Sequence, residues 1–297
     1  MVYYFSKLGL IKYFVFLILS FVISAVLTVP VITLTGGFSS ALLIFITSVA
    51  LYVSILLLIW YISLTPSDRQ LILKPAPARS QGNLLFAFAP FLWSLPINVI
   101  YVLFLERFFP DFFDKMLEAT NLPQNFLNSS DPLSLILLFL AVVVFAPIVE
   151  EIAFRGVLYN LLNKRISLFP AALISSVVFG LLHGATFFQT AAIGLVLAFI
   201  YQVTGDLRMS MLGHAVNNGL AFLQGILIEN RVIVSGEPSE IVFTSLLLAG
   251  GVGMIIISLV YLKNNPLRSI YKDRAPMYKH EIARQYNYES TELPNSF

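Results

Sequence analysis

Eight apolar runs, separated by short polar segments, make up most of this 297-residue chain. A helix needs about 20 mainly apolar residues to cross the hydrocarbon core of a bilayer. We therefore predict an all-α fold, a polytopic transmembrane bundle of about eight helices, or seven crossings if the fifth and sixth runs form one broken element. The predicted spans are residues 13–34, 42–64, 84–105, 133–162, 168–187, 190–203, 207–228 and 242–262.

The basic residues between these runs predict the orientation of the bundle. Cytoplasmic loops carry an excess of Lys and Arg, so both termini are expected to be cytoplasmic. If eight helices alternate, one side of the membrane receives Lys7, Lys12, Arg69, Lys74, Arg79, Lys164, Arg165, Arg208, Lys263 and Arg268. The opposite side receives an acidic stretch, residues 106–131, whose interspersed phenylalanines predict a short helix in the membrane interface.

Composition supports lipid as the main solvent. The chain is 58% hydrophobic and 11% charged, with a mean hydropathy of +0.85, whereas soluble domains carry about 25% charged residues. We expect an integral protein of the cell membrane. A net charge of +2 gives no reason to expect nucleic acid as a partner. The absence of cysteine excludes disulfides, a cysteine nucleophile and thiolate metal sites.

Ionisable side chains inside these runs are the exception, because such groups cost several kcal/mol in a bilayer and usually face a protein interior. They gather at three places: Pro147-Ile-Val-Glu150-Glu151-Ile-Ala-Phe-Arg155, Phe179-Gly-Leu-Leu-His183 and His214-Ala-Val-Asn217-Asn218. Two of the three histidines in the chain lie in these segments.

Helical spacing places several of these side chains on shared faces. Glu151 and Arg155 are four residues apart and are expected to form an ion pair. Glu150 points about 100° away around the helix, so the ion pair does not automatically engage it, and the two acids can have different roles, one structural and one chemical. The pairs Phe179–His183 and His214–Asn218 have the same spacing of four. Pro147 lacks an amide donor and is expected to kink its helix just before the glutamates.

Two chemistries fit these residues. A carboxylate facing an imidazole can deprotonate a water, while a second imidazole and an amide donate to the oxyanion formed at a peptide carbonyl. Alternatively, Glu150, His183 and His214 could bind a divalent metal such as zinc with water in the remaining position.

Non-catalytic roles are the alternative to both of these chemistries. A single intramembrane His or Asn often serves only as an interhelical hydrogen bond, and a proton-coupled transporter keeps ionisable residues near the midplane. Transporters commonly show repeat symmetry, but these polar groups lie only in the second half of the chain. Three spaced motifs together favour a catalytic constellation.

The ordered motifs resemble the CPBP family of intramembrane peptidases, also called the CAAX-protease and bacteriocin-processing (Abi) family. Its Glu-Glu-x-x-x-Arg motif is similar to Glu150-Glu151-Ile-Ala-Phe-Arg155, and its Phe-x-x-x-His and His-x-x-x-Asn motifs to Phe179–His183 and His214–Asn218. The resemblance covers residues 133–223. It implies an intramembrane endopeptidase acting on a lipidated (CAAX-type) or other membrane-associated peptide or protein.

The resemblance also implies roles and boundaries. Glu150 is expected to be the general base and His183 to help hold the water. His214 and Asn218 would form the oxyanion site, with Glu151, Arg155 and Phe179 in support. Residues 1–132 would then hold N-terminal membrane helices and the interfacial loop, residues 133–262 the catalytic core, and residues 263–297 a cytoplasmic tail. The alternatives are a non-catalytic membrane immunity or scaffold protein and, third, a proton-coupled transporter.

Overall fold

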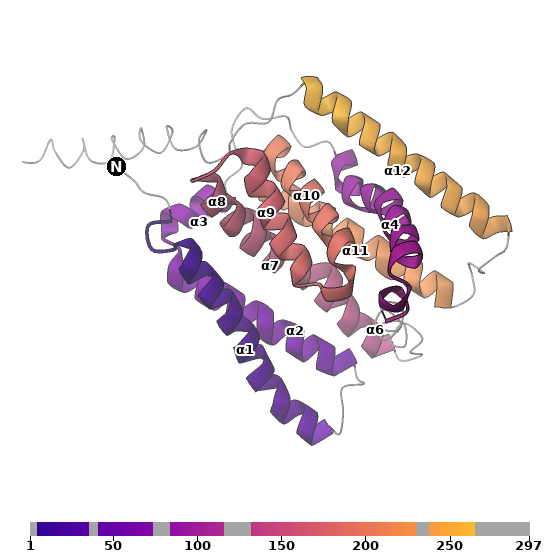
Figure 1. Ribbon diagram of the computed structural model, residues 1–297. Coiled ribbons are helices and arrows are strands. Elements are labelled where there is room, and N and C mark those ends of the chain that lie inside the picture. The colour runs from indigo at the N-terminus through magenta and orange to yellow at the C-terminus, as the bar shows by residue number, and fades with distance from the viewer. Residues whose placement is uncertain (1–4, 36–40, 74–83, 116–131, 230–237, 265–297) are drawn as a thin grey trace, which may run out of the picture.

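The computed structural model describes residues 5–35, 41–73, 84–115, 132–229 and 238–264, and their regular structure is helical (Figure 1). Each of the eight apolar runs falls on helix, so the all-α prediction is confirmed. The expected tail lies outside the described residues beyond Asn264. The expected interfacial helix is helical at residues 110–115, and residues 116–131 lie outside the described part.

The first half of the chain contributes a helical hairpin and one further long helix. Its elements are α1 (Leu10–Thr35), α2 (Ala41–Ile55), the π-helical η1 (Leu56–Ser63), α3 (Pro66–Leu73), the 3-10 turn η2 (Leu84–Phe88) and α4 (Ala89–Phe108). α1 packs along α2, and α2 continues directly into η1. The N-terminal segment is fastened by Asp68, whose buried carboxylate accepts from the backbone N–H of Phe5 at 2.7 Å.

The fourth run is one continuous helical stretch in which α-helix and π-helix alternate. It comprises α6 (Pro132–Phe139), π-helical η3 (Leu140–Phe145), α7 (Ala146–Glu151), π-helical η4 (Ile152–Tyr159) and α8 (Asn160–Asn163). The two glutamates therefore lie in a short α-helical piece between two π-helical pieces, a feature often found at functional sites.

Four helices complete the bundle. They are α9 (Leu168–Leu181), α10 (Phe187–Thr204), α11 (Leu207–Glu229) and α12 (Pro238–Asn264), with the 3-10 turn η5 (Gly184–Thr186) between α9 and α10. α9 ends before the predicted residue 187 because Gly184 turns the chain with a φ of +58°. That left-handed conformation costs glycine nothing.

Among the described residues, five helices are long and apolar enough to cross a membrane, namely Leu10–Leu34, Leu42–Ser63, Phe86–Phe108, Pro132–Asn163 and Phe187–Thr204. Leu168–Leu181 and Leu248–Tyr261 are shorter apolar helices. α11, predicted as a full span, is not among the candidates found there. The protein is nonetheless a polytopic membrane protein, as the hydropathy pattern predicts.

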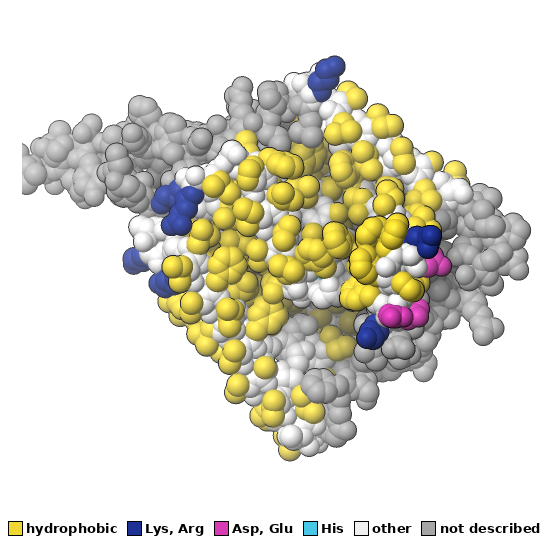
Figure 2. All heavy atoms as spheres, in the orientation of Figure 1, with side chains coloured by type: hydrophobic (Ala, Val, Ile, Leu, Met, Phe, Trp, Pro, Cys, Tyr) yellow, Lys and Arg dark blue, Asp and Glu magenta, His cyan; other side chains and the backbone are white. Residues whose placement is uncertain are grey.

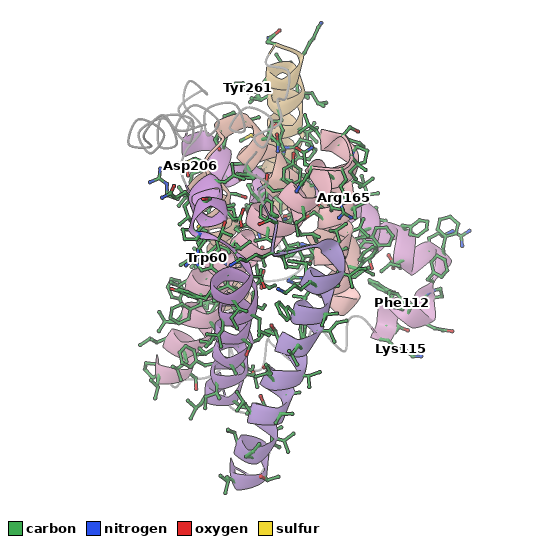
Figure 3. All side chains as sticks on the ribbon, turned by 90° about the vertical axis from the view of Figure 1, so that its left-hand side faces the viewer. Trp60, Phe112, Lys115, Arg165, Asp206 and Tyr261 are labelled. Carbon is green, nitrogen blue, oxygen red and sulfur yellow. The ribbon has the colours of Figure 1, made fainter. Side chains whose placement is uncertain are left out.

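The surface agrees with this conclusion. Figure 2 shows a broad apolar face with basic and acidic side chains confined to its edges. Exposed residues on α1 include Ile11, which is 84% exposed, and Leu34, which is 86% exposed. In Figure 3, Arg165 and Asp206 lie away from Phe112 and Lys115 along the bundle. Lipid is the surrounding that such a surface requires.

Packing joins both halves of the chain into one bundle. α10 packs against α9, α4 and α11, and α12 packs against α4. α9 and α10 approach closely at Gly180, where an added Cβ would lie 2.6 Å from the carbonyl oxygen of Phe187. α2 reaches across to α6 and α7, so the N-terminal hairpin touches the stretch that carries the glutamates.

Candidate active site

Glu151 joins α7 to α11 and is fully buried. Its Oε1 accepts a hydrogen bond of 2.8 Å from Nη1 of Arg155, so the predicted ion pair is present. The same oxygen lies 2.9 Å from Nδ1 of His214, and Oε2 accepts a 2.5 Å hydrogen bond from the hydroxyl of Ser210. Both carboxylate oxygens are therefore engaged, and their partners fix the position of the imidazole.

The guanidinium of Arg155 is buried and makes two further contacts. Its Nη2 donates to the carbonyl oxygen of Gly194 on α10 at 2.8 Å. Its Cζ lies 4.5 Å from the ring centroid of Phe179, within the range of a cation–π contact. Because an unpaired buried charge is strongly destabilising, these contacts explain how an arginine is tolerated here.

Glu150 has different surroundings from those of its neighbour. Its side chain is 17% exposed, and its Oε2 lies 3.8 Å from Nε2 of His214. Tyr52, on α2, lies beside Glu150 and Ser48. The two adjacent glutamates thus face opposite nitrogens of one imidazole, Glu151 at Nδ1 and Glu150 at Nε2.

His183 reaches the cluster through Phe179. Its Nδ1 lies 2.7 Å from the Phe179 carbonyl oxygen, and its ring centroid lies 4.6 Å from that of Phe179. A carbonyl oxygen only accepts, so Nδ1 carries the hydrogen and Nε2 of the neutral ring keeps its lone pair. Phe179 also contacts His214 edge-on at 5.8 Å between centroids. The exposed His183 and the buried His214 therefore share one aromatic neighbour.

Asn218 lies one turn beyond His214 on α11 and is bonded at both ends of its amide. Its Nδ2 donates to the carbonyl oxygen of Val142 at 2.9 Å, and its Oδ1 accepts from Nδ2 of Asn217 at 3.0 Å. An amide nitrogen carries two hydrogens, so one N–H is left to donate elsewhere. Asn218, which the sequence spacing pairs with His214 on one helix face, is therefore also hydrogen-bonded to the backbone of η3.

Sequence reasoning did not identify three contributors to this cluster. Ser210 precedes His214 by four residues, so the helical spacing that revealed the other pairs could have found it. Gly194 takes part through its backbone carbonyl, which leaves no signal in the sequence. Tyr52 comes from a distant helix, and only the tertiary packing brings it to Glu150.

The metal hypothesis receives no support from the side-chain arrangement. No group of three or more His, Asp or Glu side chains in the described residues is gathered so as to hold a metal ion. Glu150, His183 and His214 consequently do not form a ligand set here.

Comparisons with known proteins find a similarity over the same segment. Residues 132–220 match the family described as type II CAAX prenyl endopeptidase Rce1-like. YdiL of Bacillus subtilis (strain 168), whose name describes it as a candidate membrane peptidase, is 34% identical over 77 residues, 25% of this chain. The chain covers about a third (32%) of that relative's length. No solved structure matches.

The family match spans all three motifs, from the helix that carries Glu150 to Asn218 on α11. The matched residues nearly coincide with residues 133–223, over which the three motifs resemble the CPBP family. Over residues 132–220, this chain is therefore similar to a family of membrane peptidases.

Proposed function

We propose that this protein is an intramembrane endopeptidase in which Glu150 acts as the general base on a water molecule. One observation carries the proposal: of two adjacent acids, Glu151 is bound on both oxygens by Arg155, His214 and Ser210, whereas Glu150 is partly exposed beside an imidazole. A catalytic base needs that access to water, and a bracing acid does not.

The histidines have complementary tasks in this proposal. Nε2 of His183 carries a lone pair and accepts a hydrogen bond from the attacking water. Nε2 of His214 must donate to the oxyanion, so His214 acts as an imidazolium between the two carboxylates. Glu151 and Arg155 then neutralise each other, as do Glu150 and His214, which keeps the buried cluster neutral overall.

The reaction balances without further components. The water oxygen bonds to the carbonyl carbon while its proton passes to Glu150, and the resulting oxyanion is held by His214 and the remaining N–H of Asn218. Collapse of this intermediate breaks the C–N bond. Glu150 returns the proton to the leaving amine, so the carboxylate is regenerated. No step requires a metal.

The substrate is proposed to be a lipidated, CAAX-type or other membrane-associated peptide or protein. The description of the matching family as a CAAX prenyl endopeptidase supports this class. The position of the cluster within an apolar bundle supports a substrate that reaches it from the bilayer, and we place the protein in the cell membrane.

Cleavage of lipidated and unlipidated peptides by the purified full-length protein tests the proposal. Glu150→Gln should remain folded and lose at least about 10²-fold in kcat, the usual contribution of a general base. Glu106→Gln, a change of the same kind at an exposed residue of α4, is the matched control and should cut like wild type. Undiminished cleavage by Glu150→Gln would contradict the mechanism. If wild type cuts no member of the panel, a non-catalytic immunity or scaffold role is favoured instead.

A further inference from the structure

The helix immediately before the glutamates has a break in its hydrogen bonding. In η3 each N–H reaches five residues back, as in any π-helix, and the N–H of Ala146 donates to the carbonyl oxygen of Ala141. The next residue is Pro147, which has no N–H to donate. The break therefore falls one turn ahead of Glu150 and Glu151.

The carbonyl affected by this break is that of Val142. In α-helical spacing its donor would be Ala146, whose N–H is bonded to Ala141. In π-helical spacing its donor would be residue 147, which is proline. A carbonyl shielded from water is costly to leave without a partner, and for the half-buried Val142 the side chain of Asn218 supplies the missing donor at 2.9 Å.

This hydrogen bond also fixes which way the amide of Asn218 faces. A carbonyl oxygen can only accept, so it must meet Nδ2 and not Oδ1. Oδ1 in turn accepts from Asn217 at 3.0 Å. With both ends of the amide bonded, the second N–H of Asn218 has a defined direction, which is the preorganisation that an oxyanion donor requires.

We propose that Pro147 is a positioning residue for Asn218: by withholding an N–H, it reserves the Val142 carbonyl for the Asn218 amide. This inference rests on the proposed function, in which Asn218 donates to the oxyanion. In this proposal, Pro147 has a second role in addition to the helix kink predicted from its sequence position. The hydrogen bond joins two positions that lie 76 residues apart in the chain, Val142 and Asn218.

The unaltered protein provides the first test. Nuclear magnetic resonance of protein labelled with 15N at asparagine reports the two side-chain amide protons of Asn218, assigned with Asn218→Ala. One proton should exchange with solvent at least about tenfold more slowly than the other, because only one is bonded to Val142. Equal, rapid exchange of both protons would overturn the proposal without any variant having to fold.

Pro147→Ala provides the second test, since alanine restores an N–H at this position. Where the π-helical spacing continues by one residue, the restored N–H at position 147 donates to the Val142 carbonyl, and Asn218 should lose the slow exchange of its bonded proton. The kcat for peptide cleavage should fall about tenfold with little change in KM, as for an interaction made in the transition state. Pro30→Ala, at an exposed proline inside α1, is the matched control and should change neither readout.

The two readouts separate this inference from the proposed function. If the exchange of Asn218 is the same in Pro147→Ala as in wild type, the positioning role is overturned even where cleavage falls. If Asn218 loses its protection and cleavage is unchanged, the positioning role stands, and it is the oxyanion role of Asn218 that fails.

Discussion

Oε1 of Glu151 lies 2.9 Å from Nδ1 of His214, so the second acid of the Glu-Glu pair orients the histidine of a different motif. A carboxylate at Nδ1 holds the ring with Nε2 directed toward Glu150. Arg155 binds the same carboxylate oxygen and balances its charge. Glu151 is thus both half of a buried ion pair and the anchor of the imidazole, and its replacement should affect stability and catalysis separately.

Glu151→Gln should lower the free energy of unfolding by about 3–5 kcal/mol, because it leaves the buried Arg155 without a counter-charge. Glu151→Gln/Arg155→Met should recover most of that loss, since no unpaired charge remains, but should stay inactive because His214 has lost its anchor. Thermal unfolding in detergent and peptide cleavage measure the two effects. A double variant as unstable as the single one would contradict the ion-pair account.

Ser210→Ala tests the third partner of Glu151. Ser210 is completely buried and bonds Oε2 at 2.5 Å, and a hydrogen bond to a charged group contributes about 1.5–3 kcal/mol. We expect a stability loss in that range together with reduced kcat. Ser20→Ala is the control: Ser20 is equally buried but bonds only within α1, to the carbonyl of Phe16. Equal losses in the two variants would argue against a special role for Ser210.

Tyr52→Phe examines the contact between the N-terminal hairpin and the proposed base. The change removes only the hydroxyl that lies beside Glu150 and Ser48, so the bundle should remain folded. Loss of this polar neighbour of the carboxylate should lower kcat about tenfold, equivalent to about 1.4 kcal/mol. Tyr61→Phe, at an exposed tyrosine of η1, should behave like wild type. An unchanged kcat in Tyr52→Phe would show that the Tyr52 hydroxyl on α2 does not contribute to cleavage.

Features governed by periodicity were predictable from the sequence. The apolar runs predicted the helices because the bilayer fixes their length and polarity. Spacing of four predicted the Glu151–Arg155 pair, and the same rule applies to Ser210 and His214. The serine does not stand out in the sequence, because a helical serine commonly bonds back to its own helix.

Features that depend on the backbone or on distant packing were not predictable. The carbonyls of Gly194 and Val142 take part in the site, yet a carbonyl is common to every residue. The π-helical spacing that frees Val142 shifts hydrogen bonds without changing the apolar pattern. The sequence predicts α11 as a full span, whereas it is not among the candidate spans found in the described residues.

Gly194→Ala should disturb the cluster from the side of α10. An added Cβ would lie 2.9 Å from Nη2 of Arg155 and 3.2 Å from Cδ1 of Phe179. Nη2 must then move from the Gly194 carbonyl, and the guanidinium carries Glu151 with it, so both stability and kcat should fall. Overpacking of this kind costs about 1–3 kcal/mol.

Gly253→Ala supplies the matched control for this prediction. A Cβ at Gly253, on α12, meets nothing within 4 Å, and alanine favours helix over glycine by up to about 1 kcal/mol. Its unfolding temperature should stay level or rise, with cleavage unchanged. If Gly194→Ala behaves like Gly253→Ala, the Arg155–Gly194 hydrogen bond does not fix the guanidinium, and Glu151 must be held by His214 and Ser210 alone. Reduced cleavage without loss of stability would instead indicate that Arg155 can shift without lowering the free energy of unfolding. The position of its guanidinium would then affect cleavage through Glu151 and His214.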